Sequence, residues 1–321
     1  MAAMRVLAYI IAGTVLLTGC SKTTNQPASQ AEIRLGAQLF TEKRLSRDGS
    51  LSCASCHDPA RGFTDGQKVA VGINGAKGTR NTPTIYGVAH MSKLFWDGRA
   101  DTLEAQALGP LTSPIEMAAN PDDVVAWLSE DETYRKGFQE AFGGPPTLER
   151  LTKALASFQR AVKLEPSPFD RWRNGEADAI SEAAKRGYKT FSQQGRCSVC
   201  HRGTELTDGE FHNLGMELDP KNPDLGRFAI SNFEAHRGAF KTPTLYNVDL
   251  TAPYMHDGSL ATLEDVVEFY DKGGGSGEGR SALMRPLNLT AQEKADLVEF
   301  LKTLTAPDNS KQLLEAALTD R

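Results

Sequence analysis

The sequence of 321 residues contains no apolar run long enough to span a membrane. Its most apolar stretch, residues 6–17, is too short for that purpose and has the length of a signal-peptide core. The chain also lacks a large excess of charge of one sign, since its net charge is −5, which argues against binding to nucleic acid. Segments with the alternating pattern of β-strands are few, so the sequence predicts a mostly helical fold.

The beginning of the chain predicts export and a lipid anchor. Arg5 provides the positive flank of a signal peptide, and "LTGC" places small residues directly before Cys20, as in a bacterial lipobox. We therefore expect residues 1–20 to be a lipoprotein signal peptide, with Cys20 lipidated at the outer membrane, facing the periplasm. Residues 21–30, rich in Ser, Thr, Asn and Gln, are typical of a flexible tether. An ordinary signal peptide with a chance cysteine is the alternative.

Cysteine is scarce, and the four other cysteines lie in two short motifs, "CASCH" and "CSVCH". Disulfides or redox pairs are conceivable for C-x-x-C in an exported protein, but a zinc ribbon needs its two pairs much closer together. A histidine follows each pair directly, and C-x-x-C-H is the attachment motif for c-type haem. The sequence therefore predicts two covalent haems, the first on Cys53, Cys56 and His57 and the second on Cys197, Cys200 and His201.

The chain repeats itself, with copies 160 residues apart. "NTPTIYGVA" (81–89) returns as "KTPTLYNVD" (241–249), and "DGRADTLE" returns as "DGSLATLE". We therefore expect two cytochrome c-like haem domains with long loops, an N-terminal one over 31–175 and a C-terminal one over 176–321. Helical periodicity is predicted over residues 31–44, 121–142, 147–163, 178–193, 262–272 and 290–305.

The residues between and around the haem motifs resemble a known family. The segments 80–117 and 242–274, together with the two haem motifs, resemble the bacterial di-haem cytochrome c peroxidases and their MauG relatives over residues 31–305. This resemblance implies a periplasmic enzyme that reduces hydrogen peroxide or uses it to oxidise a protein substrate. It also implies that the domain over 31–175 is the peroxidatic one and that the domain over 176–321 transfers electrons, and it allows a homodimer.

Three side chains acquire roles from this resemblance. Glu116 in "SPIEM" matches the catalytic glutamate, which can move a proton between the two peroxide oxygens. Gln106 matches a glutamine of the distal pocket, and Trp96 matches a residue between the haems that can carry an electron or a hole. In the internal repeat Trp96 aligns with His256, so the two halves diverge at this position.

The resemblance also implies one Ca²⁺ between the domains. Asn81 matches a side-chain ligand, while Thr251 and Pro253 match residues that ligate through their carbonyl oxygens. Oxygen ligands of this kind suit calcium.

One departure from the family concerns the first haem. Many of its peroxidases carry a histidine, in the loop before the R-N-T-P-T segment, that caps this haem until the enzyme is activated. The corresponding loop, residues 69–81, has no histidine here. We therefore expect an open first haem without prior reduction, and its three glycines predict a mobile loop.

The distal ligand of the second haem is predicted to be Tyr270. It lies 14 residues after His256, where classical family members have methionine and MauG-type members have tyrosine. Tyr270 also shares an apolar helix stripe with Leu263, Val266 and Val267. A core tyrosine is the alternative, and other candidate ligands are Met216, Met255, Met284, His212, His236 and His256.

Three functions fit these features. The first is a peroxidase that receives electrons from a small cytochrome c or cupredoxin through the second haem and Trp96. The second is a MauG-like enzyme that oxidises residues of a partner protein. The third is an electron-transfer cytochrome without catalysis, which would have no need for Glu116.

Overall fold

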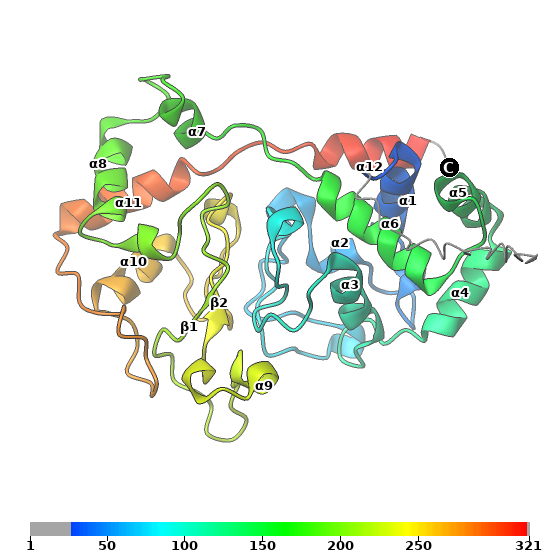
Figure 1. Cartoon of the computed structure of the whole chain (residues 1–321), viewed down its shortest axis with the longest axis horizontal. Coiled ribbons are helices and arrows are strands. Elements are labelled where there is room, and N and C mark those ends of the chain that lie inside the picture. The colour runs from blue at the N-terminus through cyan, green and yellow to red at the C-terminus, as the bar shows by residue number, and fades with distance from the viewer. Residues whose placement is uncertain (1–26, 320–321) are drawn as a thin grey trace, which may run out of the picture.

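The computed structural model describes residues 27–319, and it consists mainly of short helices joined by long loops in two lobes (Figure 1). The predicted signal peptide, and all of the tether but residues 27–30, lie outside the described residues. The helices of the first half are α1 (Gln30–Phe40), α2 (Cys53–Cys56), α3 (Leu103–Thr112), α4 (Pro121–Glu130), α5 (Glu132–Phe142) and α6 (Leu148–Ala161). Those of the second half are α7 (Pro168–Arg173), α8 (Glu182–Ser192), α9 (Phe228–Ser231), α10 (Leu263–Asp271), α11 (Ala291–Lys302) and α12 (Ser310–Thr319).

Strand structure between residues 27 and 319 is confined to one short antiparallel pair, β1 (Phe211–His212) and β2 (Phe240–Lys241), apart from isolated bridges. No helix in this part of the chain is long and apolar enough to cross a membrane. The expected mostly helical fold is confirmed.

The predicted helices are present, with one error. A single helix was expected over 121–142, but the structure contains α4 and α5, which meet at Asp131. The Asp131 carboxylate accepts hydrogen bonds from the amides of Thr133 (3.0 Å) and Tyr134 (3.2 Å). This capping interaction starts a new helix inside a continuous apolar pattern.

Each lobe is built on a pair of crossed helices whose backbones touch at a glycine. In the first lobe α1 packs on α6, where a Cβ on Gly36 would lie 2.0 Å from the carbonyl oxygen of Ala154. In the second lobe α8 packs on α11, where a Cβ on Gly187 would lie 1.9 Å from the carbonyl oxygen of Asp296. Apolar side chains of these helices, among them Leu155 and Phe300, are buried around the crossings.

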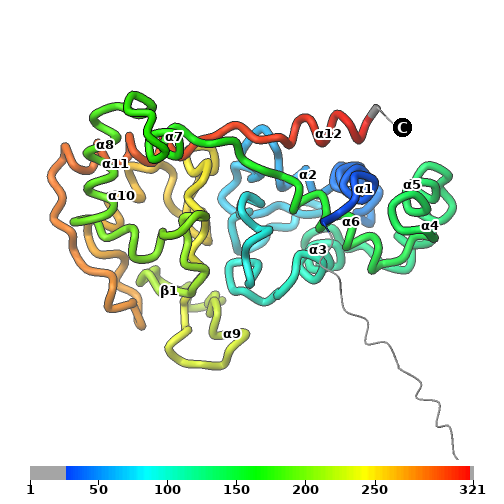
Figure 2. Tube along the Cα trace, turned by 45° about the horizontal axis from the view of Figure 1, so that its top comes forward, coloured from blue at the N-terminus to red at the C-terminus, as the bar shows by residue number. Residues whose placement is uncertain are grey.

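The chain returns to the first lobe at its end, which corrects the expected domain boundary. Residues 176–321 were predicted to form one domain, but α12 packs on α1, and Gln38 Nε2 donates to the carbonyl of Ala317 (2.8 Å). Figures 1 and 2 both show α12 lying beside α1. The two connections between the lobes also pair with each other, at Leu164 and Asp308. The first lobe is therefore α1–α6 with α12, and the second lobe is α7–α11.

Candidate functional site

The first C-x-x-C-H motif forms the one-turn helix α2, and His57 follows its last residue. The Nδ1 atom of His57 lies 3.0 Å from the carbonyl oxygen of Phe63, to which it can donate. That hydrogen bond fixes the tautomer and leaves Nε2 for a metal. Burial lowers the pKa of His57, which favours the neutral form that metal binding requires.

The second motif has the same construction. His201 follows a short turn at Cys197–Val199, and its Nδ1 lies 3.0 Å from the carbonyl oxygen of Leu206. Phe63 and Leu206, which supply the two carbonyls, both have positive φ angles, 61° and 49°. This conformation is costly for residues other than glycine, so each lobe accepts backbone strain where a carbonyl orients the histidine.

The residues around the second motif fit a haem. A large, mostly apolar cavity is lined by Cys197, Cys200 and His201, and it extends between the lobes to Trp96. The four described cysteines form no disulfide, and burial raises the pKa of Cys197 to about 12. Two thiols that form no disulfide, beside an oriented histidine and an apolar cavity, suit a macrocycle attached through thioethers.

Glu116 and Gln106 lie on neighbouring segments of the first lobe. Glu116 is half-buried in a turn that folds back on α3, because the Met117 amide donates to the carbonyl of Pro110 (3.1 Å). The pKa of Cys56 is raised to about 11, mainly by burial, with smaller contributions from the charges of Asp65 and Glu116. Glu116 therefore lies near the first haem motif, and Gln106 is half-buried on the adjoining α3.

The loop expected to be mobile, residues 69–81, is a hydrogen-bonded hairpin. The Gly72 amide donates to the carbonyl of Ala76, and the Gly78 amide donates to that of Ala70, both over 2.8 Å. Ile73 is 2% exposed, and its amide donates to the carbonyl of Glu116 (2.9 Å). These hydrogen bonds do not support the expectation of a mobile loop. One of its glycines, Gly72, instead allows the hairpin to pack closely against the backbone of Ile115.

Trp96 lies where the lobes meet. Its indole Nε1 donates to the carbonyl of Asn81 (2.9 Å), and its own carbonyl accepts from the amide of Lys241 (2.8 Å). The amide of Asn81 donates in turn to the carbonyl of His256 (2.7 Å). These three bonds connect Trp96 to both lobes.

The residues expected to bind calcium all line the interlobe cavity. Asn81 is 6% exposed, and its Nδ2 donates to the carbonyl of Gln67 (2.8 Å), which leaves Oδ1 for another partner. Thr251 and Pro253 line the same cavity from the second lobe. Amide and peptide carbonyl oxygens are ligand types that Ca²⁺ accepts, so the residue types present are compatible with the expected ion.

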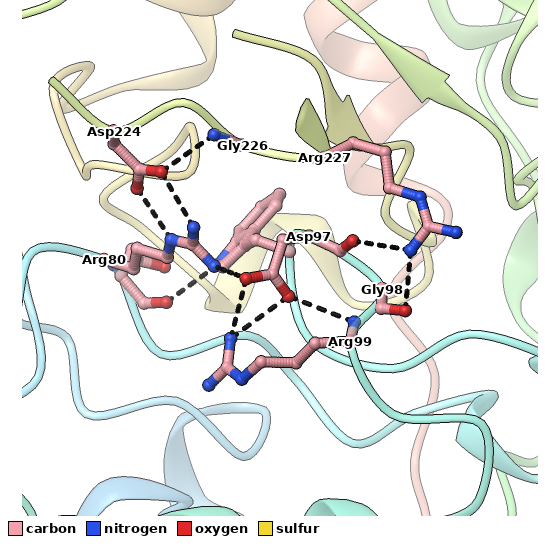
Figure 3. Close-up of polar contacts among 9 residues, drawn as sticks. Arg80, Asp97, Gly98, Arg99, Asp224, Gly226 and Arg227 are labelled. Carbon is pink, nitrogen blue, oxygen red and sulfur yellow. Dashed lines mark hydrogen bonds and ion pairs between the residues drawn. The ribbon is translucent and has the colours of Figure 1, made fainter. Parts of the chain in front are cut away.

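A charge cluster beside Trp96 was missed from the sequence. Arg80 binds the Asp224 carboxylate through Nε and Nη2 (2.7 and 2.8 Å) and Asp97 through Nη1 (2.7 Å), as Figure 3 shows. Arg227 donates to the carbonyls of Asp97 and Gly98. Since Asp224 and Arg227 belong to the second lobe, these contacts join the lobes. The arginine directly before Asn81 was the available signal, but its partner lies far away in the sequence.

Tyr270 lines the same cavity as His201, near Cys197 and Cys200. Burial raises the pKa of its hydroxyl. Within the described part of the chain that hydroxyl makes no hydrogen bond, whereas those of Tyr246 and Tyr254 are bonded to Asp170 and to a carbonyl. Other candidate ligands also line the cavity, namely Met216, Met255, Met284, His212 and His256. His236 instead bonds to Ser231.

Two oriented C-x-x-C-H motifs in two similar lobes define a c-type di-haem protein. Residues 30–178 match the family of di-haem cytochrome c peroxidases, and residues 184–305 match that of cytochrome c. The chain belongs to the di-haem cytochrome c peroxidase family and is an oxidoreductase.

Its relatives divide between two activities. Methylamine utilization protein MauG of Methylorubrum extorquens is 43% identical over 87% of this chain and 80% of that protein. Cytochrome c551 peroxidase of Nitrosomonas europaea is 35% identical over 99% of this chain and 93% of that protein. A crystal structure of a MauG-like protein associated with microbial copper homeostasis has a TM-score of 0.82 at 39% identity, covering 87% of this chain and 90% of that one.

Proposed function

We propose that this protein is a periplasmic peroxidase that reduces hydrogen peroxide to water with electrons from a small cytochrome c or cupredoxin. Each turnover consumes one peroxide, two electrons and two protons and releases two water molecules. The first haem, which Cys53, Cys56 and His57 would hold, would supply the iron that binds the peroxide. Glu116 takes a proton from one peroxide oxygen and returns it to the other, which leaves as water. Gln106 donates a hydrogen bond that orients the peroxide.

The observation that carries this proposal is the position of the turn that holds Glu116: the next residue, Met117, is buried in the apolar cluster against which Cys53 of the first haem motif packs. The second haem, which Cys197, Cys200 and His201 would hold, would supply the redox centre that accepts electrons, and Trp96 would carry them between the lobes. The hydrogen bonds that Trp96 makes to Asn81 and Lys241 support that route, because they hold the indole between the lobes.

The test replaces Glu116 by glutamine. Glu116→Gln keeps the size of the side chain and removes the acid, so turnover with reduced cytochrome and peroxide should fall by about 10²–10⁴-fold. Glu130→Gln, at an exposed position of α4, is the matched control and should turn over normally. Equal rates for the two variants would refute the role of Glu116.

A second candidate function is MauG-like oxidation of residues in a partner protein. The position of Tyr270 favours it, because an oxygen ligand on the second haem stabilises the oxidised iron rather than the reduced one. Incubation with peroxide and a candidate partner, followed by mass spectrometry of the partner, separates this activity from turnover of a reduced cytochrome.

The proposal includes one Ca²⁺ on Asn81, Thr251 and Pro253, and a lipid anchor on Cys20. Cys20→Ser should release the exported protein from the membrane fraction. Wild-type protein that is already free of the membranes after export would contradict the lipid anchor.

A further inference from the structure

The hairpin around Gly72 touches the turn that carries Glu116, backbone against backbone. A Cβ on Gly72 would lie 2.0 Å from the carbonyl oxygen of Ile115 and 2.7 Å from the Cα of Glu116. The φ angle of Gly72 is −94°, which any residue can adopt, so the contact alone requires glycine here. Since both sides of the contact are main chain, neither can give way by rotating a side chain.

Ile73 fastens the hairpin to the same turn. Its amide donates to the carbonyl of Glu116, and its side chain is fully packed in the lobe. The side chain of Ile115, by contrast, is 47% exposed, so it does not anchor the turn. Glu116 also receives little support from its own side chain, because within residues 27–319 its carboxylate makes no hydrogen bond or ion pair.

The hairpin is itself held at its base. The Ala70 amide donates to the carbonyl of Arg80 (3.0 Å), and the Arg80 guanidinium binds Asp97 and Asp224. The hairpin that contacts the turn of Glu116 is therefore connected, through Arg80, to the interlobe charge cluster.

We propose that Gly72 and Ile73 are positioning residues, which hold the backbone of Glu116 so that its carboxyl group reaches the peroxide. This inference rests on the proposed function of Glu116. A proton donor works only within hydrogen-bonding reach of the atom that it serves, and a displacement of about 1 Å can cost about 100-fold in rate. The hairpin thus fixes the acid/base group through main-chain contacts.

The test compares Gly72→Ala with Gly78→Ala on the same hairpin. A Cβ on Gly78 would meet its nearest atom, the carbonyl oxygen of Ala70, at 3.4 Å, which is ordinary contact. Gly72→Ala should react with peroxide at least tenfold more slowly in the oxidised protein, and Gly78→Ala should react like the wild type. Hydrogen exchange at the Ile73 amide should become faster only in Gly72→Ala. A Gly72→Ala protein that contains both haems and matches the wild type in both measurements would overturn the proposal.

A double mutant separates positioning from general damage. If Gly72 acts through Glu116, Gly72→Ala should add no further loss of rate in a Glu116→Gln background. If the losses of rate from the two substitutions add fully, Gly72 affects only the stability of the protein, and the positioning role is overturned. A normal rate for Glu116→Gln alone would refute the proposed function instead.

Ile73→Ala provides a second route if Gly72→Ala does not fold. It removes the buried anchor but keeps the amide, so exchange at residue 73 should become faster and the peroxide reaction slower. An unchanged rate would overturn the positioning role.

Discussion

The two lobes share one construction but differ in the side chains at equivalent places. Gly36 and Gly187 occupy the same position at the two helix crossings. His57 and His201 each bond to the carbonyl of a residue in the left-handed conformation. Tyr86 and Tyr246 each donate to a carboxylate, that of Asp308 just before α12 and that of Asp170 in α7. Attaching and orienting a haem is therefore the function of the repeated framework.

The two lobes differ in the side chains that follow one shared backbone turn. Phe95 and Met255 are equivalent and share positive φ angles of 66° and 72°, but the next residues are Trp96 and His256. Trp96 bonds to a carbonyl between the lobes, whereas His256 stacks on Phe240 with ring centroids 3.5 Å apart. In the proposed function, these specialised side chains on a shared backbone would let one lobe hold the acid/base group and the other receive the electrons.

Substitutions at the helix crossings should have the largest effect on the framework that the two lobes share. Gly36→Ala and Gly187→Ala should each lower the free energy of unfolding by about 1–3 kcal/mol or more, because the added methyl group collides with a backbone carbonyl. Gly137→Ala on α5 is the control, since its Cβ would meet only the end of the Leu35 side chain at 3.2 Å. Denaturant unfolding measures all three. Equal stability of Gly187→Ala and Gly137→Ala would contradict the close crossing.

The ligand of the second haem is the next difference to test. Tyr270→Met should raise the potential of that haem by on the order of 100 mV, because a thioether favours the reduced iron more than an oxygen ligand does. Redox titration of the two haems measures the shift, with Tyr188→Phe in the same lobe as the control. An unchanged potential and spectrum would mean that Tyr270 is a core residue, and Met255 or Met284 would then be tested.

The ion pair between the lobes should give the smallest effect. A double-mutant cycle of Arg80→Met and Asp224→Asn should give a coupling energy of roughly 1 kcal/mol, because both groups are only partly exposed and bind through two hydrogen bonds. The exposed pair of Arg237 and Glu234, within one lobe, should give a smaller coupling energy, because solvent screens the two charges. If the coupling energy of Arg80 and Asp224 is no larger than that of Arg237 and Glu234, the charge cluster does not join the lobes.

Several features could be predicted because they are local in the sequence. The C-x-x-C-H motifs place two thiols and a histidine within five residues, and the repeat shows that the fold is duplicated. Apolar periodicity located α10 and α11, and their capping boxes confirm where they begin. The helix break at Asp131 was missed, because a capping side chain there interrupts an unbroken apolar pattern.

What the sequence by itself determined is therefore the chemistry: two attached haems, a duplicated helical fold and the residue types available around each haem. The tertiary structure alone decided which distant segments meet. It placed α12 on the first lobe, paired Arg80 with Asp224, and turned a glycine-rich loop into a hairpin that contacts the backbone of Glu116. Such contacts depend on backbones approaching closely at single glycines and on partners far apart in the chain, and neither leaves a periodic pattern in the sequence.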